Sequence, residues 1–171
     1  MQITRQADYA IRAVRYLAQQ GTEENIAIRA TARAKKLAER TTANKKAVVT
    51  SEDEKKTVKD LNVPTSEVAK AMNIPASFLA KIISQLSIAG LLSTSRGASG
   101  GVTLKREPKY ISVLDVVEAI DGPILLNECV GNNKHCDFEG ECLVHPIWIE
   151  VQESLVKRLR ETRFDVLFDK A

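Results

Sequence analysis

Residues 65–90 read TSEVAKAMNIPASFLAKIISQLSIAG and predict two short helices joined by a tight turn. The first helix is expected over about 65–71, and Asn73-Ile74-Pro75 makes the turn. Proline suits the first position of a helix, so the second helix is expected over 75–89, and Gly90 ends it. Apolar residues recur at helical spacing along the second helix and predict its buried side: Phe78, Leu79, Ile82, Ile83 and Leu86.

Two β-rich runs follow directly. Residues 91–95 read LLSTS, residues 102–105 read VTLK, and the glycine-rich sequence RGASGG separates them over 96–101. Such runs around a glycine-rich tip predict an antiparallel hairpin. A hairpin placed directly after the second helix of such a pair is a wing. The expected fold class is therefore mainly α with a small β-hairpin wing, that is, a winged helix-turn-helix.

This fold predicts double-stranded DNA as a partner, because the second helix of a helix-turn-helix enters the major groove. The net charge of +3 is too small to establish this alone, but residues 1–110 carry most of the Lys and Arg. Arg96 at the wing tip is placed to enter the minor groove or to contact phosphate. Lys81 suits guanine or phosphate, and Ser77 suits DNA contact or helix capping. The candidate DNA-contacting side chains on the outer side of the second helix are Ser77, Lys81, Ser84 and Gln85.

The chain before this motif divides into two unlike parts. Residues 4–20 predict a helix with one apolar stripe, ended by Gly21. Residues 22–60 contain no aromatic residue, Gly or Pro, and form an atypical charged insertion. The insertion is interpreted either as an extra DNA-contacting arm or as a solvated helix, a mobile insertion or disorder. We expect residues 1–110 to form the DNA-binding domain and residues 111–171 to carry a ligand loop and a dimerisation helix.

The C-terminal part predicts two further helices. Ser112 with Asp115 makes a capping-box pattern that starts a helix, and Gly122-Pro123 stops it. Pro146 opens a final helix to about residue 164. Its apolar residues approach the spacing of a coiled-coil seam: Trp148, Val151, Leu155 and Leu159. With nothing after the helix to cover this stripe, we expect a homodimer; the alternative is that the helix packs on its own domain.

All three cysteines of the chain lie within residues 129–145, which read CVGNNKHCDFEGECLVH. Thiolate and imidazole are donors that bind iron–sulfur clusters, zinc or copper(I). An odd number of cysteines in a reducing compartment argues against a disulfide framework. Structural zinc sites usually include a Cys-x2–4-Cys pair, whereas the gaps here hold six and five residues, so a larger inorganic core is favoured over zinc. The candidate ligands are Cys129, Cys136, Cys142 and His145.

Other classes of protein receive little support. No apolar run approaches the length of a membrane span, and the N-terminus lacks the apolar core of a signal peptide. A cytoplasmic location without a membrane partner is therefore expected. No nucleophile–base motif or phosphate-binding glycine loop occurs, so the chain is predicted not to be an enzyme.

Taken together, these residues resemble the Rrf-type family of winged-helix transcription regulators, with its IscR-, NsrR- and RirA-like members. The resemblance covers nearly everything except residues 22–60, where the family has only a short connection. It lies in residues 1–18, in Val63-Pro64-Thr65, in residues 89–97 with Gly100-Gly101, and in the three-cysteine loop. IscR-like members carry a Glu–Gln pair where this chain has Ala80 and Lys81, so a different operator preference is expected.

The resemblance implies a repressor that binds a near-palindromic operator under the control of an iron–sulfur cluster sensing iron, redox or nitric oxide status. His145 would be the fourth ligand of a 2Fe–2S cluster, as in IscR-like members. Asp8 is a rival fourth ligand, because NsrR-like members use an N-terminal acid from the partner subunit to complete a 4Fe–4S cluster. Thiol redox sensing without a cluster, as in CymR-like members, is a further possibility. The alternative from another class is a small redox, electron-transfer or structural-zinc protein whose helix-turn-helix makes protein contacts.

Overall fold

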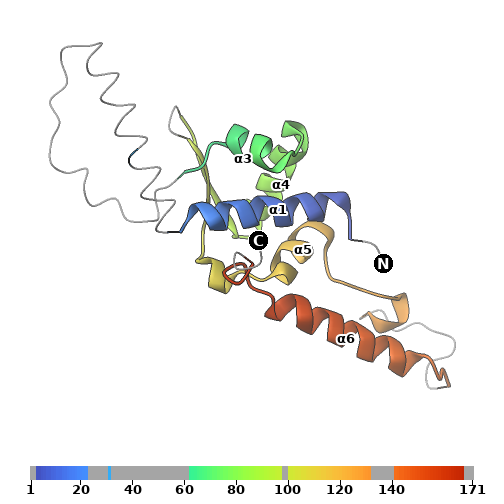
Figure 1. Ribbon diagram of the computed structural model, residues 1–171. Helices are drawn as coiled ribbons and strands as arrows, with labels where there is room; N and C mark the ends of the chain where they lie inside the picture. The colour runs from blue at the N-terminus through green and yellow to red at the C-terminus, as the bar shows by residue number, and fades with distance from the viewer. Residues whose placement is uncertain (1–2, 23–30, 32–61, 98–99, 132–140, 168–171) are drawn as a thin grey trace, which may run out of the picture.

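The computed structural model describes residues 3–22, 31, 62–97, 100–131 and 141–167. Helix α1 lies at the centre and contacts α3, α4 and α5, while α6 packs against α5 and extends away from the rest (Figure 1). The fold is mainly helical with one two-stranded antiparallel sheet, as predicted. The elements are α1 (Arg5–Gln20), α3 (Thr65–Met72), α4 (Ala76–Ile88), β1 (Leu92–Ser95), β2 (Gly101–Leu104), the 3-10 helices η3 (Pro108–Tyr110) and η4 (Glu128–Val130), α5 (Val113–Asp121) and α6 (His145–Glu161).

Helix α1 begins one residue after Thr4, which caps it by accepting a hydrogen bond from the Ala7 amide at 3.2 Å. An N-cap of this kind satisfies an amide that has no partner within the helix. The predicted helix over 4–20 is thus confirmed. Its buried residues are mostly small, which lets neighbouring helices approach closely: Ala7, Ala10, Ala13, Val14, Leu17 and Ala18.

Helices α3 and α4 form the predicted helix-turn-helix. Asn73 adopts the left-handed conformation between them, with φ 51°, and Ile74 is buried beneath the turn. Pro75 is the N-cap of α4 rather than its first residue, so the helix begins at Ala76, one residue later than predicted. The prediction that Phe78 is buried is wrong, since its side chain is 47% exposed and its ring meets the edge of Tyr9 with centroids 6.3 Å apart. Gly90 has φ 73° and ends α4 as predicted.

The wing is a regular hairpin in which Leu92 pairs with Leu104 and Ser95 with Gly101. A third segment joins its outer edge, because the Val63 and Val102 amides each donate to the other's carbonyl at 2.9 Å. Gly101 lies directly against this contact. A Cβ atom added there would lie 2.4 Å from the Val63 carbonyl oxygen and 2.7 Å from its carbon. Both atoms are backbone and cannot rotate away.

Gly101→Ala is therefore expected to lower the free energy of unfolding by about 1–3 kcal/mol, because either the strand or the Val63 segment must shift. Urea unfolding followed by circular dichroism measures this change. Ser93→Ala is the matched control, since Ser93 is exposed on β1, and it should change stability by less than about 0.5 kcal/mol. Equal stabilities for the two variants would contradict the close packing of Val63 on the wing.

The predicted capping box at the start of α5 is present. The Ser112 hydroxyl accepts from the Asp115 amide at 3.1 Å, and Asp115 accepts from the Ser112 amide at 2.7 Å. The prediction that the last helix runs to about 164 is wrong, because α6 ends at Glu161. The chain then turns back to the start of α5. The Phe164 amide donates to the Ile111 carbonyl at 3.1 Å, and the Phe164 side chain is fully buried.

One hydrophobic cluster joins residues from both sides of position 110, where the sequence predicts a domain boundary. Leu79 and Val102 from the helix-turn-helix and the wing share it with Val116 and Phe164. A smaller cluster of Leu114, Val117 and Ile124 packs against half-buried side chains of α6. Of the predicted insertion over 22–60, only residues 22 and 31 are among those described.

No helix among the described residues combines the length and the apolar character needed to cross a membrane.

Candidate nucleic-acid interface and metal site

The outer face of α4 is accessible and mostly polar, apart from Ile88 at its C-terminal end, which is 85% exposed. Its buried face is formed by Leu79, Ile82, Ile83 and Leu86, so the residues about half a turn away point outward. Ser77, Lys81 and Ser84 are all exposed there. Gln85, the fourth candidate, is half-buried and accepts a hydrogen bond from the side-chain amide of Gln6 on α1.

Arg96 lies at the tip of the wing, directly after β1, and is exposed. The turn beyond it depends on glycine. Gly97 has φ 106°, a conformation that side chains rarely adopt, and its carbonyl accepts from the Gly100 amide at 2.8 Å. A Cβ on Gly100 would lie 2.5 Å from the Ser95 carbonyl oxygen. The glycines of the tip thus hold a tight loop that carries Arg96 into solvent.

Three of the four candidate metal ligands are among the described residues, and they lie on or next to two elements that pack together. Cys129 is in η4, which packs against α6, and Cys142 comes shortly before α6. Both are free and half-buried, and His145, the first residue of α6, is also half-buried. Cys136 lies outside the described residues. Within the part of the chain that the structure describes, no three His, Cys, Asp or Glu side chains come close enough together to hold a metal ion.

Asp8, the alternative ligand, lies in the first turn of α1. Its carboxylate contacts the guanidinium of Arg12 at 2.7 Å, and both side chains are about half exposed. An ion pair of this exposure adds little stability. Asp8 is therefore accessible on the surface of the chain but already paired within its own helix.

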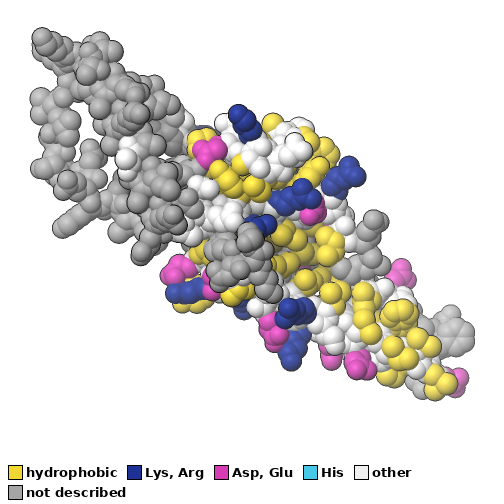
Figure 2. Space-filling view, in the orientation of Figure 1, with side chains coloured by type: hydrophobic (Ala, Val, Ile, Leu, Met, Phe, Trp, Pro, Cys, Tyr) yellow, Lys and Arg dark blue, Asp and Glu magenta, His cyan; other side chains and the backbone are white. Residues whose placement is uncertain are grey.

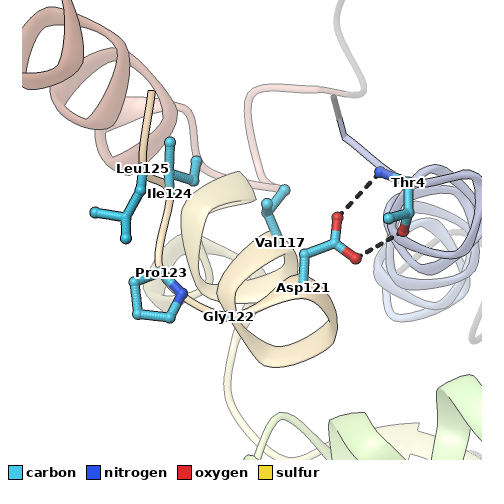
Figure 3. Close-up of a pocket in the computed structure, with 7 residues that line it drawn as sticks. All are labelled: Thr4, Val117, Asp121, Gly122, Pro123, Ile124 and Leu125. Atoms are coloured by element: carbon cyan, nitrogen blue, oxygen red, sulfur yellow. Dashed lines mark hydrogen bonds between the residues drawn. The ribbon is translucent and has the colours of Figure 1, made fainter. Parts of the chain in front are cut away.

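One polar contact without a signal in the sequence joins the end of α5 to the start of α1. The Asp121 carboxylate accepts from the Thr4 amide at 3.0 Å and from the Thr4 hydroxyl at 2.6 Å (Figure 3). Asp121 ends α5 eight residues before Cys129, and it lines a surface pocket of about 300 Å³ with Thr4, Val117 and residues 122–125. A carboxylate at the N-terminus of α1 is stabilised by the helix dipole. No local sequence signal links residues 117 positions apart.

The predicted seam on α6 is divided between two environments. Leu155 and Leu159 are half-buried and pack against the small cluster at α5. Trp148 and Val151 remain 38% and 47% exposed. Figure 2 shows hydrophobic side chains gathered along the part of the molecule where α6 extends. The exposed large hydrophobic residues of this region, which we call the α6 apolar face, are Leu143, Val144, Ile147, Trp148 and Val151.

A helix pair whose second helix exposes a polar face, followed by a hairpin, defines a winged helix-turn-helix protein. Residues 54–170 match the family model of Rrf2, described as an iron-dependent transcriptional regulator. The chain therefore belongs to the Rrf2 family, which confirms the resemblance found in its sequence.

The relatives with related sequences are transcriptional regulators rather than enzymes. IscR of Klebsiella pneumoniae is 32% identical over 75 residues, which cover 44% of this chain and 45% of IscR. The Rrf2-like helix-turn-helix regulator of Rhodobacter capsulatus is 32% identical over 75 residues, 41% of this chain and 50% of that protein. The chain thus matches about half the length of these relatives.

Two solved structures share the fold over the whole chain. CymR, the global cysteine regulator of B. subtilis, superposes with a TM-score of 0.64 at 19% identity and covers 100% of this chain and 98% of its own. IscR of T. potens has a TM-score of 0.63 at 20% identity and covers 100% of this chain and 89% of its own. At these identities the likeness concerns the fold alone.

Proposed function

We propose that this chain is a DNA-binding transcriptional repressor that acts in the cytoplasm. The observation that carries the proposal is the exposed polar face of α4, formed by Ser77, Lys81 and Ser84, with the exposed Arg96 on the adjacent wing. A helix of this kind in the major groove leaves the wing near the neighbouring backbone or minor groove. Membership of the Rrf2 family supports the same function.

The repressor acts as a homodimer on a near-palindromic operator. The α6 apolar face exposes Trp148, an aromatic residue of the kind that anchors protein interfaces, beside Val151 and next to charged side chains on the same helix. A symmetric pair would bring two copies of α4 to half-sites about 34 Å apart, one turn of the duplex. Leu155 and Leu159, which pack on α5, would hold α6 in place next to this interface.

An iron–sulfur cluster controls the repressor in this proposal, with 2Fe–2S favoured over 4Fe–4S. The donor set fits such a group: Cys129 and Cys142 are free thiols, and His145 begins the helix against which η4 packs. Cys136 completes the set, and Asp8 of a second copy is the alternative to His145. The family model is described as iron-dependent, which supports iron over zinc. When bound, the cluster supplies a group whose iron can be lost or oxidised, so iron supply, redox poise or nitric oxide is the signal.

The residues between the ligand loop and α4 provide a physical connection. Asp121, at the end of α5 and eight residues before Cys129, accepts hydrogen bonds from Thr4 at the N-terminus of α1. The first turns of α1 then contact α4 through the Gln6–Gln85 hydrogen bond and the Tyr9–Phe78 ring contact. A coupling of about 1–3 kcal/mol across such a connection changes the affinity for the operator about 5–150-fold.

Protein purified without air is expected to contain iron and inorganic sulfide and to bind DNA from its own promoter region in a gel shift at moderate salt. Cys142→Ser should remove most of the iron, because a serine oxygen is a poor cluster ligand, and should abolish the difference in affinity between loaded and cluster-free protein. His145→Ala and Asp8→Ala, compared by iron content and visible spectrum, identify the fourth ligand.

The controls separate the alternatives. Ser154→Ala, an exposed position on α6, should leave iron content unchanged. Colourless protein that holds zinc firmly, or metal-free protein whose DNA affinity follows thiol oxidation, would exclude the cluster but not the repressor. Absence of DNA affinity in every metal and redox state would exclude the repressor and favour a redox or electron-transfer protein.

A further inference from the structure

The outer face of α4 carries a restricted set of chemical groups. The structure describes α4 in full, and the helix contains no Asp or Glu and a single amide side chain, Gln85. Five exposed residues share the face that points away from the buried Leu79, Ile82 and Leu86: Ser77, Ala80, Lys81, Ser84 and, as the last residue of the helix, Ile88. The three small residues lie within the first nine positions of α4, where Lys81 is the one long side chain on this face, so this part of the helix can approach a groove floor closely.

Helix α1 occupies one flank of this face. Gln85 accepts a hydrogen bond from Gln6, and Phe78 meets the edge of Tyr9. Reading adenine requires an amide side chain free to both donate and accept at N6 and N7. Because the Gln85 oxygen already accepts from Gln6, we interpret Gln85 as a positioning residue that holds α4 against α1. This changes its predicted role as a DNA-reading residue.

The remaining groups match only part of the major-groove code. A lysine ammonium donates to the O6 and N7 of guanine, an alanine methyl contacts the C5-methyl of thymine, and serine contacts either base or backbone. Cytosine is read by a carboxylate, which α4 lacks. Ala80 and Lys81 are consecutive, so their Cα atoms are about 3.8 Å apart, close to the rise of one base pair.

We propose that Ala80 packs against a thymine methyl group and that this thymine lies within one or two base pairs of the guanine bound by Lys81. Ala80 thereby determines part of the operator sequence. The inference rests on the proposed function, since it assumes that α4 enters the major groove. It adds to the proposed function the identity of one base, a thymine, in each half-site.

The test uses the full-length protein and an operator selected from its promoter region, with each half-site thymine replaced in turn by deoxyuridine. Deoxyuridine removes only the C5-methyl, so one position per half-site should weaken binding about fourfold. The Ala80→Gly variant lacks the alanine methyl group, so the same replacement should not weaken its binding any further. Ala71→Gly is the matched control, because Ala71 is an exposed alanine on α3, and it should retain the full penalty.

A second variant keeps the proposal testable if Ala80→Gly folds poorly. Ala80→Glu places a carboxylate at the same exposed position with a good helix former, and it should exchange the preference for thymine at that base pair for cytosine. In parallel, 7-deazaguanine at the neighbouring guanine should weaken binding by the wild type but not by Lys81→Ala, because it removes the N7 acceptor.

The outcomes separate this inference from the proposed function. The role of Ala80 is overturned if the protein binds its operator but no deoxyuridine replacement weakens binding. It is also overturned if the replacement weakens binding by Ala80→Gly as much as binding by the wild type. Both outcomes leave the proposed repressor function intact. If the protein selects no operator from its promoter region, the proposed function itself is overturned. An unchanged thymine preference in Ala80→Glu also contradicts the inference, because the contact would then come from another residue.

Discussion

Phe164→Ala is expected to lower the free energy of unfolding by about 3–5 kcal/mol, the cost of removing a large buried aromatic side chain. Phe164 is fully buried although it lies beyond the end of α6, and it belongs to the same cluster as Leu79 of α4 and Val102 of the wing. The cavity would therefore open where the C-terminal segment, α4 and the wing meet. Thermal or urea unfolding measures the loss.

Val166→Ala provides the matched control, because Val166 lies two residues away in the same segment and is 51% exposed. It should change stability by less than about 0.5 kcal/mol. If Phe164→Ala lowers the free energy of unfolding no more than Val166→Ala does, the segment after Glu161 does not contribute to the core. A loss of several kcal/mol is a large fraction of the stability of a domain of this size, so measurement at low temperature is advisable.

Trp148→Glu is expected to raise the dissociation constant of the proposed homodimer roughly a thousandfold. A truncated or charged interface anchor costs about 2 kcal/mol or more, and twofold symmetry places two such substitutions in one interface. The total of about 4 kcal/mol corresponds to that factor. Sedimentation velocity over a range of protein concentrations measures the change, and operator affinity should fall with dimer occupancy.

Lys157→Glu is the corresponding control, since Lys157 is exposed on α6 and does not belong to the α6 apolar face. It should leave the dissociation constant within about threefold of the wild-type value, because a peripheral charge is screened by solvent and salt. A Trp148→Glu protein that dimerises as tightly as the wild type would show that the α6 apolar face is not the interface between copies.

The local signals of the sequence predicted the elements of the helix-turn-helix correctly. The turn at Asn73-Ile74-Pro75, the left-handed Gly90 and the capping box of Ser112 with Asp115 each depend on residues within a few positions of one another. Such signals act through backbone conformation and short-range hydrogen bonds. They therefore predict where a helix begins and ends without knowledge of its neighbours.

The candidate site could be predicted only in part. Helical spacing placed Ser77, Lys81 and Ser84 together on an accessible face, and it also predicted that Phe78 is buried. Phe78 is instead half exposed, because α1 covers that flank of α4 only partly and meets the ring at its edge. The ligand assignment on Cys129, Cys136, Cys142 and His145 remains a prediction, since Cys136 lies outside the described residues.

The class of fold, the family and the outer face of the reading helix could therefore be predicted from sequence, because helix periodicity, turn residues and caps are properties of neighbouring positions. Three further contacts became visible in the packed chain alone: Asp121 with Thr4, Gln85 with Gln6, and Phe164 with the core. The two hydrogen-bonded pairs join residues 117 and 79 positions apart. Their formation depends on how α1, α4 and α5 pack together, which no short-range pattern encodes.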